Sequence, residues 1–114
     1  MKPGIILDQK IAMDIMGWRQ IPLPAHYDTE YGLTWMWNKR EGCFRHEIQT
    51  VPRFSHEVEY AFEVAEKAEL FKDHFLHKNY KGEWEVSDIR LLEKYVGETP
   101  AHAICLAVLR IKNE

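Results

Sequence analysis

The sequence predicts an α+β fold in which a small antiparallel sheet of three to four strands is covered by three helices. Two pairs of short segments alternate between apolar and polar residues, which is typical of β-hairpins. Three other segments repeat apolar residues at helical spacing. One of them, residues 99–111, is apolar almost all round, and such a helix is either buried or forms a partner surface. We therefore expect the rest of the chain to pack around it.

The helix expected over residues 99–111 has a clear start. Thr99 suits the N-cap, because its hydroxyl accepts a hydrogen bond from an unpaired backbone N–H. Pro100 suits the first helical position, where its missing N–H costs nothing. Cys105 is expected to be a small buried hydrophobic residue. A disulfide with Cys43 is not expected, since disulfides are rare in a reducing cytosol. The apolar residues of the segment are Ala101, Ala103, Ile104, Cys105, Leu106, Ala107, Val108, Leu109 and Ile111.

A first helix is expected near the N-terminus. Asp8 is a good capping residue, so the helix should run from there to about Met16. Gly17 is its expected C-terminal stop, and Trp18 should fold back over the helix end. This helix should present a short apolar face made by Leu7, Ile11, Ala12, Ile15 and Met16.

Two hairpins follow from the alternating segments. Residues 33–38 and 44–48 should form the first, around a turn at 39–42, and residues 75–80 and 84–89 the second, around 81–83. The four strands are expected in one sheet. Residues 91–96 fit a helical turn and a short strand equally well.

The remaining helix begins after Phe54. Ser55 is expected as its N-cap. Its predicted apolar stripe consists of Val58, Ala61, Phe62, Ala65 and Ala68. Its acidic side, which we expect to face solvent, carries Glu57, Glu59, Glu63, Glu66 and Glu69.

Length and composition limit the class of protein. A chain of 114 residues fits one domain, residues 1–114, with a core of its own. The net charge of −3 argues against a general nucleic-acid surface, which usually carries a basic excess. No apolar run reaches the roughly 18 residues that span a bilayer, so no membrane partner is expected. An acidic residue at position 8 comes too early for a signal peptide.

The histidines and cysteines do not form a catalytic or metal-binding pattern. His74 and His77 would share a face on a helix and could then hold zinc, but they lie at a predicted helix-to-strand junction. His102 and Cys105 are the one close Cys–His pair on a predicted helix, and the apolar neighbours of Cys105 argue against a reactive thiolate. The sequence therefore predicts no catalytic residue, no metal site and no cofactor.

Aromatic residues next to cations are the best remaining signal of a ligand site. Trp35 and Trp37 share a predicted strand face, and Arg45 lies in the same hairpin. Aromatic rings beside cations can stack a base and neutralise a phosphate. Arg53 lies at a predicted helix start, where free N–H groups favour an anion. The alternative is that both tryptophans pack in the core, as large aromatic residues usually do.

Three pieces of the chain, in this order, resemble the phage α-β-α (ABA) sandwich family. They are Met16-Gly17-Trp18, the acidic helix that begins at Phe54-Ser55, and Trp84-Glu85-Val86 followed by residues 103–107. The resemblance covers roughly residues 7–19 and 54–111, and its motifs are mostly core and cap residues. It implies a phage or prophage origin and a cytoplasmic protein that acts inside a bacterial host. It implies no particular reaction.

Three functions stay open on the sequence. The first is a non-enzymatic phage accessory protein that binds a host component or sequesters a small ligand, such as a nucleotide; it would be a homo-oligomer, since a short chain makes a deep pocket most readily between subunits. The second is a small enzyme, with or without a metal, in which two or more histidines meet a carboxylate in one cleft. The third is a structural subunit that presents an exposed apolar patch. The histidines of the second hypothesis are His46, His56, His74 and His77.

Overall fold

The computed structural model describes residues 1–20, 35–38 and 47–112, with backbone alone at 19–20, 35–38 and 47–50. The α+β class is confirmed: three helices accompany a three-stranded antiparallel sheet of order β4-β5-β6. A second three-stranded sheet has the order β1-β2-β3. The elements are α1 (Ile5–Asp14), β1 (Arg19–Gln20), β2 (Trp35–Asn38), β3 (Glu47–Thr50), α2 (Val58–Lys67), the 3-10 helix η1 (Leu70–Lys72), β4 (His74–Lys78), β5 (Trp84–Asp88), β6 (Lys94–Gly97) and α3 (Pro100–Lys112).

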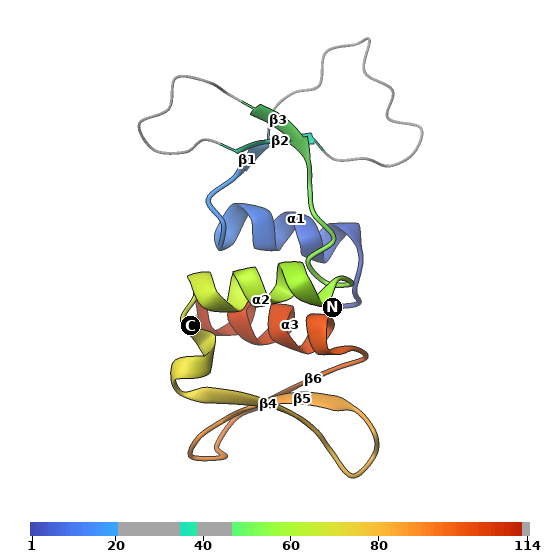
Figure 1. The fold of residues 1–114 in the computed structure, drawn as a ribbon, viewed down its shortest axis with the longest axis vertical. Coiled ribbons are helices and arrows are strands. Elements are labelled where there is room, and N and C mark those ends of the chain that lie inside the picture. The colour runs from blue at the N-terminus through green and yellow to red at the C-terminus, as the bar shows by residue number, and fades with distance from the viewer. Residues whose placement is uncertain (21–34, 39–46, 113–114) are drawn as a thin grey trace.

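Helix α3 lies at the centre of these layers (Figure 1). It packs beside α2, with the β4–β6 sheet on one side and α1 on the other. Because neighbours surround it, α3 buries residues around its whole circumference, and Ala103, Ile104 and Cys105 are completely inaccessible to solvent. The prediction of a buried terminal helix is confirmed. So is its start, since the Thr99 hydroxyl accepts the His102 N–H at 3.1 Å.

The second predicted hairpin forms. Of the first, residues 35–38 and 47–48 lie in paired strands, whereas residues 33–34, the turn at 39–42 and residues 44–46 lie outside the described residues. The strands of the two pairs do not share one sheet. β4 pairs with β5, with Leu76 opposite Val86, and β2 pairs with β3. The helices lie between the two sheets, so the single four-stranded sheet is wrong (Figure 1). Residues 94–97 form the edge strand β6, so the second half of the ambiguous segment is a strand, whereas residues 91 and 92 form a bend. The two-residue strand β1 pairs with β2, a contact too short for the pattern to indicate.

Asp8 does not cap α1. The helix begins at Ile5, which places Asp8 inside it and 5% exposed. The Asp8 carboxylate accepts the Ser55 N–H at 2.8 Å, and the Ser55 hydroxyl accepts the Gly4 N–H at 2.9 Å. We call this pair of hydrogen bonds the Asp8–Ser55 contact. Both side chains therefore join the start of α1 to the turn before α2, a long-range role that local spacing cannot show.

The end of α1 is close to the prediction. The helix stops at Asp14, two residues early, and Gly17 takes a left-handed φ of 76°. Trp18 then folds back, because its N–H donates to the Ala12 carbonyl at 2.8 Å and its ring is buried.

Ser55 does not cap α2 either. The N-cap is Glu57, because the Ser55 hydroxyl is already used by Gly4 and a turn at 54–56 precedes the helix. The buried stripe of α2 is also rotated from the predicted one. Phe62 is 46% exposed and instead contacts Phe71, with ring centroids 5.8 Å apart. The residues that face the core are Ala61, Val64 and Ala65.

Candidate functional site

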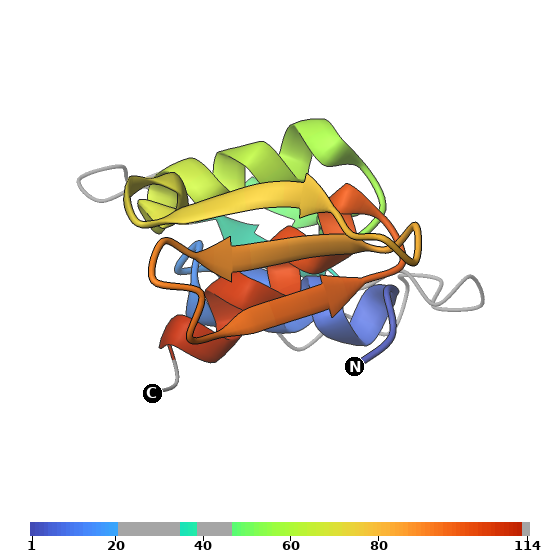
Figure 2. The ribbon, with the colours of Figure 1, turned by 90° about the horizontal axis from the view of Figure 1, so that it is seen from below.

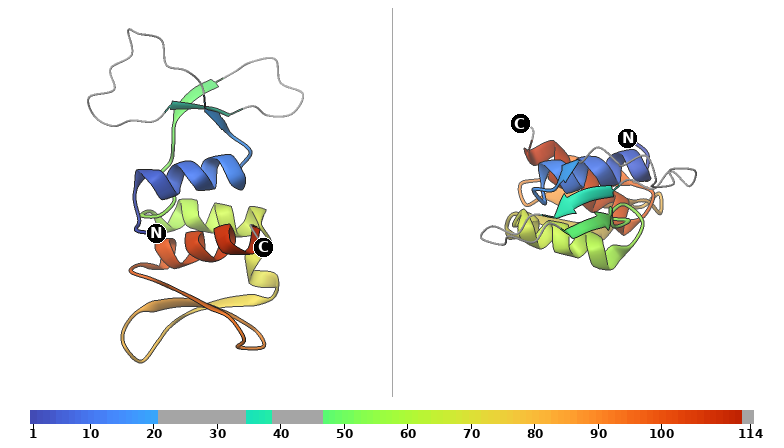
Figure 3. Two further views of the ribbon diagram at one scale, coloured as in Figure 1. Left: turned by 180° about the vertical axis from the view of Figure 1, so that it is seen from behind. Right: turned by 90° about the horizontal axis from the view of Figure 1, so that it is seen from above.

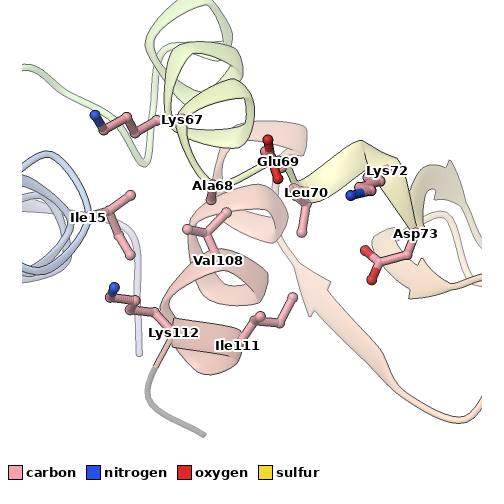
Figure 4. Close-up of a pocket in the computed structure, with 10 residues that line it drawn as sticks. All are labelled: Ile15, Lys67, Ala68, Glu69, Leu70, Lys72, Asp73, Val108, Ile111 and Lys112. Carbon is pink, nitrogen blue, oxygen red and sulfur yellow. The ribbon is translucent and has the colours of Figure 1, made fainter.

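The three helices run in the same direction, and their C-terminal ends meet at one side of the molecule (Figures 1 and 3). A pocket of about 470 Å³ opens there, between the ends of α2 and α3 and the residue that follows α1 (Figure 4). We call it the helix-end pocket. Its lining consists of Ile15, Lys67, Ala68, Glu69, Leu70, Lys72, Asp73, Val108, Ile111 and Lys112.

Apolar side chains form the floor of the helix-end pocket. Val108 and Leu70 are buried, and Ile15 lies against the same core. In Figure 4, Val108 and Ala68 lie between Ile15 and Leu70, so apolar surface crosses the pocket from one side to the other. Such a floor would accommodate the apolar body of a small molecule.

Three lysines surround this floor. Lys67 and Lys112 lie on the side of Ile15, and Lys72 on the opposite side (Figure 4). All three are exposed, and none has an ion-pair partner within the described part of the chain. Each lies in or near the last turn of its helix, where a cation is stabilised by the helix dipole. The same placement presents ammonium groups to any anion that enters the pocket.

Two carboxylates share the helix-end pocket with the lysines. Asp73 lies 2.6 Å from His74, between Oδ1 and Nδ1, so part of its charge is already engaged. Glu69 has a left-handed φ of 54° at the turn between α2 and η1. Three cations against two carboxylates give the side chains that line the pocket a formal charge of +1, which the negative ends of the helix dipoles offset in part. The arrangement suits an organic anion, with its charge at the lysines and its apolar part on the floor.

The ligand residues predicted from the sequence are not part of this pocket. The side chains of Trp35 and Trp37, and all of Arg45, lie outside the described residues. Arg53 is exposed before the N-terminal end of α2, whereas the helix-end pocket is at the opposite end of that helix. The neighbouring Ser55 is fully buried and bonded to Gly4, so its hydroxyl is not open to an anion beside Arg53.

The described histidines do not meet in one cleft. His74 and His77 both lie on β4, where a spacing of three places their side chains on opposite faces. His56 is exposed in the turn before α2, and His46 lies outside the described residues. Within the parts of the chain that the structure describes, no group of three or more His, Cys, Asp and Glu could hold a metal ion.

His77 has a serine and a carboxylate beside it on the sheet face away from α3. Its Nε2 lies 2.9 Å from the Ser87 hydroxyl and 3.4 Å from a Glu85 oxygen. In a Ser–His–acid relay the carboxylate orients the ring through the nitrogen opposite the hydroxyl. Here both groups approach the same nitrogen, and Ser87 is only 4% exposed. The three residues therefore do not form such a relay.

His102 and Cys105 do not form a catalytic pair. His102 Nδ1 accepts the Glu98 N–H at 3.0 Å, so the neutral ring carries its proton on Nε2 and donates to the Met1 carbonyl at 2.7 Å. The Cys105 thiol donates to the Phe54 carbonyl at 3.2 Å. Burial raises the pKa of Cys105 from 9.0 to about 12, and the Asp8 carboxylate adds to the shift. The expectation of a core thiol is confirmed.

Cys105 should resist alkylation in the native protein. A rise in pKa from 9.0 to about 12 lowers the thiolate fraction at neutral pH about a thousandfold, and burial blocks access. Mass mapping after iodoacetamide treatment at pH 8 should find the Cys105 peptide unmodified in the native protein and modified in denaturant. Equal labelling rates in both would contradict the burial. Because the folded thiol keeps its proton to higher pH, its contribution to stability is present below pH 9.0 and is lost as the pH rises towards about 12.

The sequence contains one signal for the helix-end pocket, in the position of its lysines. Lysines occur near the C-terminal ends of two predicted helices, at Lys72 and Lys112. The dipole explains each of them separately. Their convergence depends on the parallel arrangement of α2 and α3, which no local pattern shows.

The fold defines a small α+β domain in which a mostly buried helix packs against one antiparallel sheet. The chain belongs to the phage ABA sandwich domain family, whose model matches residues 9–109. Neither the search of curated proteins nor the search of solved structures found a match. None of the described helices has the length and apolar character needed to cross a membrane.

Proposed function

We propose that this phage domain protein is a non-enzymatic accessory protein that sequesters a small organic anion in the helix-end pocket, inside the bacterial host. The observation that carries the proposal is the apolar floor bordered by three lysines without ion-pair partners among the described residues. A concave site of this kind suits a small molecule better than a flat protein surface.

A mononucleotide matches the chemistry of the helix-end pocket. Its volume of about 470 Å³ falls in the range of small-molecule sites. The base would lie on the surface made by Val108, Leu70 and Ile15. The phosphate would meet the ammonium groups of Lys67 and Lys112, which lie on the same side of that surface. Hydrogen bonds from charged donors to phosphate are the stronger kind, so the lysines would supply most of the selectivity for an anion.

Binding should depend on these two lysines. Thermal unfolding with a panel of nucleoside monophosphates should show a rise in Tm for the wild type, because a ligand that binds only the folded state stabilises it. Isothermal titration calorimetry of the double variant Lys67→Ala/Lys112→Ala should then show an affinity at least about tenfold weaker. Without ligand, the variant should lose no more than about 1 kcal/mol of stability, as expected for two exposed cations near helix ends.

Lys10→Ala is the matched control. Lys10 is exposed on α1 and does not line the pocket, so its removal changes the net charge without changing the site. Its nucleotide affinity should equal that of the wild type. If no nucleotide raises the wild-type Tm, or if the double variant binds as well as the Lys10 control, the proposal is wrong.

A further inference from the structure

The strand β6 is an edge of its sheet. The strand order is β4-β5-β6, and Figure 2 shows β6 at the rim opposite β4. The Asp88 N–H donates to the Glu93 carbonyl at 3.1 Å, so Asp88 and Glu93 form a hydrogen-bonded pair. In an antiparallel ladder such pairs alternate with pairs that are not hydrogen-bonded. From that pair onward, Tyr95 and Gly97 hydrogen-bond to β5, and the backbone groups of Lys94 and Val96 point to the open edge. Such an edge is a template for another strand.

We propose that β6 pairs antiparallel with β6 of a second copy of this chain, with Val96 opposite Val96 on the two-fold axis. Only outward-pointing residues can share hydrogen-bonded pairs across this edge, which limits the register. Centring the pair on Val96 places the side chain of Lys94 opposite that of Glu98 of the second copy. The Glu98 N–H remains bonded to His102 Nδ1, so Glu98 contributes its side chain and not its N–H to this pair. The two-fold axis repeats this opposite-charge pair, so each dimer has two of them. Centring the pair on Tyr95 would place Lys94 opposite Val96, and the dimer would then have neither of the two opposite-charge pairs.

The residues needed for this pairing lie in β6 and directly after it. Within β6, Lys94 and Val96 alternate with Tyr95 and Gly97, and Glu98 is the first residue after the strand. Lys94 and Glu98 are exposed, Val96 is 37% exposed, and neither charged residue has an ion-pair partner in the described part of the chain. The surface is therefore complementary to itself in charge.

A groove beside β6 supplies apolar area. A pocket of about 470 Å³ lies between β6 and α3, and Tyr95, Leu106 and Leu109 are among its lining residues. A four-residue strand pair alone buries less than the roughly 1,200 Å² of a stable interface. A second copy joined at β6 would extend the sheet to six strands over this groove and cover its apolar lining.

The opposite edge of the sheet lacks this complementarity. The Ile89 N–H donates to the Asp73 carbonyl, so on β4 the outward residues are His74, Leu76 and Lys78. Pairing of β4 with itself about Leu76 would place Lys78 opposite His74, which offers no opposite charge. The edge formed by β6 is therefore the one that fits a second copy.

A charge exchange tests the proposed register. Native mass spectrometry and light scattering at low salt should show a wild-type dimer. Lys94→Glu places two carboxylates opposite each other, Glu98→Lys places two ammonium groups opposite each other, and each should weaken dimerisation about tenfold or more. A mixture of the two variants should form a heterodimer, and the double variant Lys94→Glu/Glu98→Lys should regain the dimer, because both restore opposite charges.

Lys81→Glu is the control, since it makes the same change of charge at the exposed β4–β5 turn, away from β6. It should dimerise as the wild type does, and circular dichroism should show that every variant is folded. The proposal is overturned if the wild type is monomeric at about 0.1 mM, if the single variants dimerise normally, or if the mixture forms no heterodimer. Nucleotide binding is measured separately at the helix-end pocket, so failure of one proposal leaves the other testable.

Discussion

Replacing Gly97 with alanine is expected to destabilise the protein by about 3 kcal/mol or more. Gly97 is the last residue of β6, opposite Trp84, and it lies directly against the first turn of α3. A Cβ at this position would be 2.4 Å from the Ala103 nitrogen, 2.7 Å from the Ala103 Cα and 2.9 Å from the His102 carbonyl carbon. All three are backbone atoms, so no rotamer change can relieve the contact. The strand would have to move away from α3, which is the centre of the core.

Urea unfolding followed by circular dichroism measures this effect, with Gly82→Ala as the control. Gly82 has a left-handed φ of 81° in the β4–β5 turn, and nothing lies within 4 Å of a Cβ placed there. Its substitution should cost about 1 kcal/mol, from backbone strain alone. If Gly97→Ala lowers the free energy of unfolding no more than Gly82→Ala does, then β6 does not pack closely against α3.

Replacing Asp8 with alanine is expected to cost about 3 kcal/mol, because it breaks the Asp8–Ser55 contact. The Asp8 carboxylate is 5% exposed and accepts the N–H of Ser55, which is itself fully buried. Without this acceptor a buried N–H loses its partner, and such groups cost about 1–3 kcal/mol in addition to the lost packing. Asp8→Asn keeps the shape and one acceptor oxygen, so its loss should be about half as large.

The control for this second substitution is Asp14→Ala, an exposed carboxylate on the same helix. Its effect should stay within about 0.5 kcal/mol. The same unfolding measurement applies. In addition, both Asp8 variants should lower the pKa of Cys105, since the Asp8 carboxylate contributes to its rise, while burial should keep it above 9.0. An Asp8→Ala variant as stable as Asp14→Ala would contradict the role assigned to the contact.

Elements with strong local signals were predicted well. The start of α3 follows from Thr99 and Pro100, the end of α1 from Gly17, and the β4–β5 hairpin from its alternation and its glycine turn. Capping and turn preferences act over a few neighbouring residues, so they can be read without the fold. The family was recognised for the same reason, since its motifs are core and cap residues, and the match over residues 9–109 confirms it.

Side chains that act over long distances are not predictable from local preferences. The sequence predicts Asp8 and Ser55 as caps of their own helices, because Asp and Ser favour cap positions. In the structure the Asp8 carboxylate accepts the N–H of Ser55, which lies 47 positions away in the sequence. A long-range hydrogen bond has no sequence period, so only the folded chain shows it.

The candidate site was not predictable for a related reason. The proposed nucleotide contacts come from the ends of separate helices, and each lysine alone resembles an ordinary dipole-stabilising residue. The pairing proposed for β6 likewise depends on which backbone groups face the open edge.

By itself, the sequence determined the α+β class, the buried terminal helix and the inert character of Cys105, because burial follows from the apolar residues nearest in the chain. The tertiary structure alone decided that the strands divide into two sheets, that Asp8 holds Ser55, and that three lysines gather around one apolar floor. These three features depend on the relative direction and the layering of the helices. Both are determined by the packing of residues from the whole chain and not by local preferences.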